Sequence, residues 1–381
     1  MTTKRLVRET LEALEVYLLL DDSDEPEDVK EAALCVFLEA FKTLKTPPLR
    51  SPKDVRLTQK DYDQVETFWE RMRARGAESS FQAFLGVPRF LFVQLCAEIK
   101  PRLPQYCHDI KRRGQPTKLD YVDVLALCLK YTRIGHPNFM EELGVAFGRN
   151  EAVLYRALNH GMDALLKVLI SLPDADIRYP TLQEAKKQWA GMKKQYGIPP
   201  WDPRILMVLS GDGTFASMTS PSDKDEQRLH KGHKGVGFNS VFIMDGSGCF
   251  VDAVWGMEGC YSDSRIAKVL LRRHWSASIN PHRLGMILDN GWSSIKDFSG
   301  GHPGEPPMRI RPLRNGDAIP KSLETYVEKC SVKATIYRQQ NEHGNGTLKR
   351  CYPCVIRPRL IRQRPVYVRD VEVCVRLNNL R

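Results

Sequence analysis

Three aspartates stand where predicted strands end or a predicted helix begins, in the second half of this 381-residue chain. Asp212 lies within Gly-Asp-Gly-Thr, Asp263 precedes Ser-Arg, and Asp289 ends the apolar run LGMILD. Carboxylates at strand ends face a crevice, and two or three of them suit Mg²⁺ or Mn²⁺, which prefer oxygen ligands. A two-metal site of this kind activates a water or a 3′-hydroxyl for attack on a phosphodiester. Each aspartate taken alone is equally typical of a helix N-cap or a turn.

Strand-like and helix-like patterns alternate around these aspartates and predict a mixed α/β domain. Three apolar, β-branched runs predict successive strands, the last two joined by the turn Gly246-Ser247-Gly248. The Gly- and Pro-rich segment 299–320 predicts a long surface loop, and a mostly helical pattern returns over 323–348. The expected elements are strands over 205–215, 235–245 and 249–257, a helix over 264–275, a strand over 284–289, and β-rich stretches over 364–368 and 371–375.

The first 200 residues are mainly helical in pattern, with helices predicted near 4–20, 28–45, 60–75, 88–100, 120–134 and 139–170. Within the last of these, 139–147 and 151–162 are joined by Gly148-Arg149-Asn150, the short glycine-containing link of a helix-turn-helix. The side chains that would face DNA are Arg149, Asn150, Arg156, Asn159 and His160. Two helices joined by a short turn are also common in proteins that bind no DNA, so both interpretations stay open.

The composition argues against a membrane-spanning protein and against a secreted, disulfide-rich protein. The chain is long enough to bury a core, and no run approaches the roughly 18 apolar residues of a membrane span. Its amino terminus is amphipathic rather than signal-like, so we expect the protein inside the cell. The ten cysteines are scattered and expected to be reduced; Cys351 and Cys354 could supply half of a zinc site, but no second ligand pair follows.

Positive charge is concentrated at the carboxyl terminus. The formal net charge is +11, and residues 346–381 hold nine Lys or Arg against two acidic residues. Such clustering is typical of a surface that contacts nucleic-acid phosphates, although a solvated basic face gives the same pattern. Charge and pattern together predict a helical region over 1–78, a helical, helix-turn-helix-like region over 79–198 and an α/β domain over 199–381.

Five short blocks follow one another in the second half: SGDGTFA with Asp212, KGVGFNSVFIMDGSG with Lys234, EGCYSDSRI with Asp263, LDNGWS with Asp289, and RQQNEHGNGTLKR with Glu342. In this order and composition the chain resembles the PIF/Harbinger transposases, a group of DDE superfamily endonucleases. The resemblance runs from about residue 205 to the end, where VEVCVRLNNLR is similar to the family's closing helix. The region 80–170 is similar to the family's helix-turn-helix segment.

The resemblance implies an RNase H-like fold with Asp212 on the first, central strand and Glu342 on a helix packed beside it. Asp212, Asp289 and Glu342 would be the catalytic residues and, with Asp263 in support, would hold Mg²⁺ or Mn²⁺. Three basic residues would contact DNA beside this site, namely Lys234, Arg338 and Lys349, in addition to Arg149 and Arg156 of the helix-turn-helix segment.

Some residues depart from the family pattern. Ser262 stands where the family usually has a histidine, and the small residues on either side of the Asp289 motif are replaced. Glu342 follows Asp289 by 53 residues, which is longer than a DD35E-type spacing, and the 299–320 insertion accounts for the extra length. Glu324, 35 residues after Asp289, is a rival ligand without the Arg and Gly-x-Leu-Lys surroundings of Glu342.

The function that the resemblance implies is a transposase-type endonuclease that hydrolyses DNA phosphodiester bonds and joins the freed 3′-hydroxyl to a target. A host-adopted, catalytically inactive DNA- or protein-binding module of the same fold is one alternative, favoured by the altered residues around Asp289. A metal-dependent nuclease or phosphoesterase outside any transposon is another. Expected partners are double-stranded DNA and a Myb-like DNA-binding protein that assists nuclear entry; an oligomer is compatible with the family. We expect a nuclear location with a cytoplasmic pool.

Overall fold

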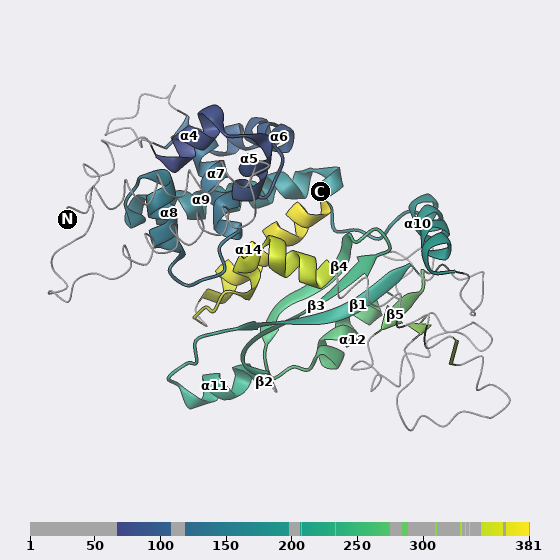
Figure 1. Cartoon of the computed structure of the whole chain (residues 1–381). Coiled ribbons are helices and arrows are strands. Elements are labelled where there is room, and N and C mark those ends of the chain that lie inside the picture. The colour runs from purple at the N-terminus through teal and green to yellow at the C-terminus, as the bar shows by residue number, and fades with distance from the viewer. Residues whose placement is uncertain are drawn as a thin grey trace, which may run out of the picture. The chain divides into compact units, whose positions relative to one another are not determined.

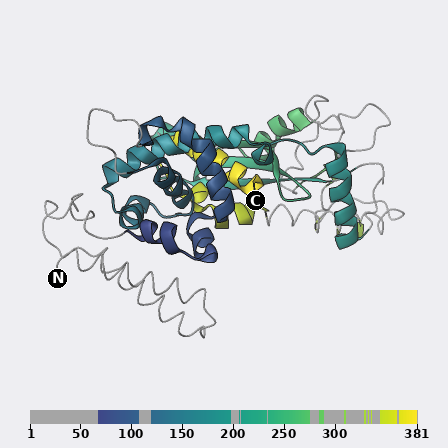
Figure 2. The ribbon, with the colours of Figure 1, turned by 90° about the horizontal axis from the view of Figure 1, so that it is seen from above.

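The computed structural model describes residues 67–107, 119–197, 206, 208–232, 234–274, 284–288, 309–310, 328–329, 332, 335, 344–360 and 363–380. The chain divides into an amino-terminal unit, Met1–Val168, and a carboxyl-terminal unit, Leu169–Arg381. Figures 1 and 2 show the helices of the first unit in purple to teal and the sheet of the second in teal to green. The helices predicted near 4–20 and 28–45 lie outside the described residues.

The described part of the amino-terminal unit is helical. Thr67 and Asp120 start two of its helices with capping boxes, in which each side chain accepts the backbone N–H three residues later. Gly86 and Gly148 end two others in the left-handed conformation that glycine adopts without strain. The helices are α4 Phe68–Arg75, α5 Glu78–Leu85, α6 Arg89–Ile99, α7 Tyr121–Thr132, α8 Phe139–Phe147 and α9 Glu151–Ser171, which continues into the second unit.

No single described helix is long and apolar enough to cross a membrane, although Glu78–Leu85 and Arg89–Arg102, bent by 54°, meet that test as a pair. Both helices of this pair bury apolar side chains in the unit's core, including Phe81, Leu85 and Leu95. Trp69 of α4 lies in the same core, where its ring packs against Phe81 and Phe92.

The described residues of the carboxyl-terminal unit form a six-stranded mixed sheet, which confirms the α/β class. The order is β2-β3-β1-β5-β6, and β4 also pairs with β3. β1 is therefore interior, antiparallel to β3 and parallel to β5. The bounds are β1 Leu209–Ser217, β2 Lys231–Gly232, β3 Gly235–Asp245, β4 Phe250–Glu258, β5 Met286–Leu288 and β6 Arg309–Ile310, with α11 Lys224–His230 preceding β2.

Helices α10, Leu182–Tyr196, and α12, Asp263–His274, cover one face of this sheet. Neighbouring residues of a strand point to opposite faces, so Leu209 shares its face with Gly211 and Gly213. Leu209 packs there with Val241 of β3, in a core that α10 and α12 complete with a larger apolar set: Ala185, Trp189, Met192, Ile266, Ala267 and Leu270.

The opposite face carries Asp212 and is covered by α14, Arg364–Asn379. The ring of Tyr367 stacks on Phe238 with centroids 5.1 Å apart, and Figure 1 shows α14 beside β3 and β4. A helix over 344–351 packs on the same side, because a Cβ on Gly344 would meet the side chain of Met244. The helix that carries Asn345 therefore lies against the strand pair that carries Asp212.

Two predictions from the sequence were wrong. The β-rich stretches over 364–368 and 371–375 form the single helix α14, as the family resemblance implies. The segment 299–320 is not all loop, since Arg309–Ile310 forms β6 beside β5.

Cys354 faces Cys374 of α14, with their sulfur atoms 3.4 Å apart, and both thiols are buried.

Candidate acidic site on strand β1

Asp212 lies in the middle of β1, opposite Phe242 of β3. Its Oδ1 accepts the backbone N–H of Gly213 at 2.8 Å, and its Oδ2 accepts a hydrogen bond from Asn345 Nδ2, also at 2.8 Å. Asn345 is 3% exposed and belongs to the helix over 344–351. Both oxygens of the carboxylate are thus oriented by the protein, while each retains a lone pair for a further partner.

Asp263, the first residue of α12, places its carboxyl group over Gly213. A Cβ at position 213 would meet that carboxyl group, so a residue without a side chain is required for the approach. The preceding loop is fixed by the buried side chain of Asn239, whose Nδ2 donates to the carbonyl oxygen of Tyr261 at 2.7 Å. Asp212 and Asp263 therefore flank the same stretch of β1 from its two faces.

Two lysines add positive charge beside Asp212. Lys349, one helical turn after Asn345, is half-buried, and this burial lowers the pKa of its ammonium group. The negative charge of Asp212 opposes the lowering of the Lys349 pKa, and the positive charge of Lys234 adds to it. Lys234 is exposed in the turn before β3. The site therefore combines carboxylates with ammonium groups, a set that can bind both a cation and a phosphate.

Asp289, Glu342 and Arg338 lie outside the described residues. Asp289 follows Leu288, the last residue of β5, and Leu288 pairs with Gly211 of β1. In the described part of the chain, no group of three or more His, Cys, Asp or Glu side chains has the arrangement of a metal site. The four-acid site stays a prediction.

The described donors fit a hard divalent cation. Asp212 and Asp263 offer only oxygen atoms, which Mg²⁺ and Mn²⁺ prefer, but the two carboxyl groups lie on opposite faces of β1, and Asp212 is the one beside Asn345. Two buried polar atoms near Asp212, Asn345 Oδ1 and Thr214 Oγ1, have no hydrogen-bond partner in the structure. Thr214 is two residues after Asp212 and so lies on the same face of β1. Buried polar atoms without partners are uncommon, and an unseen ion or its waters is one physical reason for them.

In the helix-turn-helix-like segment of the amino-terminal unit, three of the predicted DNA-facing side chains make contacts within the unit. Asn150 Oδ1 accepts the backbone N–H of Val153 at 3.0 Å, which caps α9. Arg149 Nη1 donates to the carbonyl oxygen of Gly148 at 2.9 Å. His160 Nδ1 lies 3.2 Å from the hydroxyl of Tyr106. Arg156 is exposed on α9.

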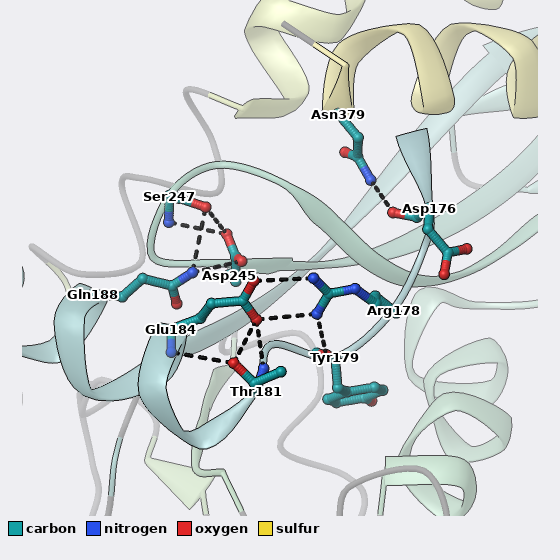
Figure 3. Close-up of polar contacts among 9 residues, drawn as sticks. All are labelled: Asp176, Arg178, Tyr179, Thr181, Glu184, Gln188, Asp245, Ser247 and Asn379. Carbon is teal, nitrogen blue, oxygen red and sulfur yellow. Dashed lines mark hydrogen bonds and ion pairs between the residues drawn. The ribbon is translucent and has the colours of Figure 1, made fainter. Parts of the chain in front are cut away.

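An open pocket of about 720 Å³ lies between α10, the β3–β4 turn and the end of α14. Its polar side chains bind one another (Figure 3): Arg178 pairs with Glu184, and Gln188 Nε2 donates to Asp245 at 2.7 Å. Hydrogen bonds from Arg178 and from Thr181 lower the pKa of Glu184 to about 2. Because these groups already have partners, we assign the pocket a structural role in holding α10 against the sheet.

Sequence reasoning missed Asn345, the residue that connects the helix over 344–351 to Asp212. Its position three residues after Glu342, close to one helical turn, was the available signal.

No protein-family model, no curated protein and no solved structure matches this chain.

Proposed function

We propose that the carboxyl-terminal unit is an RNase H-like DDE nuclease domain of the PIF/Harbinger type, which cuts DNA phosphodiester bonds with Mg²⁺ or Mn²⁺. The observation that carries the proposal is the placement of Asp212 on the interior strand β1, with the Asp263 carboxyl group over the neighbouring Gly213. The hydrogen bond from Asn345 connects β1 to the helix over 344–351. The family resemblance leads us to expect a late helix beside the first strand, so this contact supports the proposal.

In this proposal Asp212, Asp289 and Glu342 hold the metal ions, and Asp263 adds negative charge beside them. When bound, the ions would supply an activated water or 3′-hydroxyl and would stabilise the leaving oxygen. Lys349 and Lys234 hold the phosphate backbone next to the carboxylates. The half-buried position of Lys349 suits this role, since an ammonium group with little water around it attracts a phosphate strongly.

DNA is held by further basic surfaces in the same proposal. Arg156 of α9 and the basic residues of 346–381 bind DNA, and Arg338 supports the acidic site. A Myb-like partner protein assists recognition of the element ends and entry into the nucleus. These assignments rest on the family resemblance and on charge.

One observation favours the second candidate, an inactive binding module of the same fold. Asn345 and Lys349 already give Asp212 a hydrogen bond and a nearby positive charge, so the fold does not need a metal to compensate this carboxylate. The altered residues around Asp289 point the same way.

Cleavage of supercoiled plasmid DNA separates the two candidates. The wild type, Asp212→Asn and Asp225→Asn are compared with Mg²⁺, with Mn²⁺ and with a chelator. Asp225 is the matched control, because its side chain is 89% exposed on α11. We expect nicking by the wild type and by Asp225→Asn only with metal, and none by Asp212→Asn. Metal-independent binding of DNA without cleavage by the wild type would instead establish the binding module.

A further inference from the structure

Asn345 combines two features in one buried side chain. Its Nδ2 donates to Asp212 Oδ2 at 2.8 Å, while its Oδ1 is buried and has no hydrogen-bond partner in the structure. A buried carbonyl oxygen without a hydrogen-bond partner destabilises the folded protein. The side chain is 3% exposed, so bulk water does not supply that partner at low cost.

The orientation of the amide follows from its chemistry. An ionised carboxylate can only accept hydrogen bonds, so the NH₂ group must face Asp212. Turning the amide over would bring two oxygen atoms to the 2.8 Å that now separates nitrogen and oxygen. Oδ1 is therefore held in a fixed position beside Asp212, and Lys349, one turn later in the helix, does not hydrogen-bond to it.

A second side-chain amide in the same unit, that of Gln188, also donates to a carboxylate, but in different surroundings. Gln188 Nε2 donates to Asp245 Oδ2 at 2.7 Å, and Gln188 Oε1 also has no partner (Figure 3). Gln188, however, is only partly buried and lines the open pocket, and Asp245 accepts further hydrogen bonds from Ser247. That pair fixes a turn. The pair at Asp212 has a neighbouring carboxylate, Asp263, across β1.

We propose that Asn345 is a positioning residue of the metal site: Nδ2 holds Asp212 Oδ2, and Oδ1 accepts a hydrogen bond from a water in the hydration shell of the divalent cation. This inference rests on the proposed function, because it requires that Asp212 binds a metal. Mg²⁺ and Mn²⁺ keep several waters when few carboxylates bind them, and residues that orient ligands and waters commonly change metal affinity about 10–100-fold.

The test is Mn²⁺ binding by calorimetry, together with the water-proton relaxation of the bound Mn²⁺, which reports its exchangeable waters. Asn345→Leu removes both polar atoms, Asn345→Gln keeps an amide donor and an amide acceptor, and Gln188→Leu is the matched control. We expect Asn345→Leu to bind Mn²⁺ about 10–100-fold more weakly and with altered relaxation. Asn345→Gln should keep more of the affinity than Asn345→Leu does, and Gln188→Leu should behave as the wild type does.

The outcomes separate this inference from the proposed function. Wild-type affinity and relaxation in a folded Asn345→Leu variant would show that Asn345 is purely structural. If Asn345→Leu does not fold, the decision falls to Asn345→Ser, which removes the amide with a smaller side chain; wild-type affinity and relaxation in that variant would overturn the role of Oδ1. If the wild type does not bind Mn²⁺, that result contradicts the proposed function, and with it this inference.

Discussion

Replacing Gly213 with alanine tests the packing of the Asp263 carboxyl group on β1. The new Cβ would meet that carboxyl group, so the Asp263 side chain has to rotate away. The protein gains about 0.4–1 kcal/mol from the smaller entropy of the unfolded chain, and crowding costs about 1–3 kcal/mol. The net effect is a loss of between about 0 and about 2.6 kcal/mol of folding stability. Displacing a carboxylate that supports the metal should in addition weaken Mn²⁺ binding about 10–100-fold.

Calorimetric titration with Mn²⁺ measures this effect, and thermal unfolding of the metal-free protein checks the fold. Gly346→Ala is the control, because a Cβ at that position meets no atom within 4 Å. In a helix this control should gain about 0.5–1 kcal/mol of stability and bind Mn²⁺ normally. If Gly213→Ala binds Mn²⁺ as tightly as Gly346→Ala does, the carboxyl group of Asp263 has no part in metal binding.

Three further predictions concern stability, pH and DNA. Asp370→Asn should cost about 3–5 kcal/mol in urea unfolding, because it breaks a buried 2.9 Å ion pair with Arg359; a loss below about 1 kcal/mol would contradict this. The pKa of Glu184 is lowered to about 2, so its interaction with Arg178 stabilises the fold above pH 4.5, the ordinary pKa of Glu, and is lost as the pH falls towards 2. The difference between wild type and Glu184→Gln, about 0.2–1 kcal/mol at this exposed site, should accordingly shrink between pH 6 and pH 3, and a constant difference would refute the assignment. Lys349→Gln should lower the slope of log affinity for DNA against log salt by about 0.9, and an unchanged slope would exclude a phosphate contact.

Most of the sheet of the carboxyl-terminal unit could be predicted, because the runs that form β1, β3, β4 and β5 are rich in apolar and β-branched residues. Runs such as GVGFNSVFIMD predict a buried strand, and β3 covers that same range, Gly235–Asp245. Helix α14 was harder to predict from the sequence, because the sequence is rich in valine, a residue that is common in strands. Its buried residues recur instead at helical spacing, from Tyr367 through Asp370, Val371 and Cys374 to Leu377. Packing against β3 and β4 outweighs the local preference.

The candidate site could be predicted only in part. Asp212 and Asp263 carry recognisable motifs, and the requirement for Gly213 follows once the Asp263 carboxyl group is placed over it. Asn345 was missed: its position three residues after Glu342 was a signal, but the sequence gives no indication that its side chain is buried. Its partner Asp212 lies 133 residues away along the chain. Such long-range pairs become visible only in three dimensions.

The most direct test of the metal-site proposal is a calorimetric titration of the wild-type protein with Mn²⁺, beside Asp212→Asn, Glu342→Gln and the exposed control Asp225→Asn. We predict saturable binding by the wild type and by the control. Binding should be lost or strongly weakened in both Asp212→Asn and Glu342→Gln, because each substitution removes one negatively charged oxygen ligand. Equal binding by the wild type and Asp212→Asn, or no binding by any of the four proteins, would contradict the proposal of a metal-dependent nuclease.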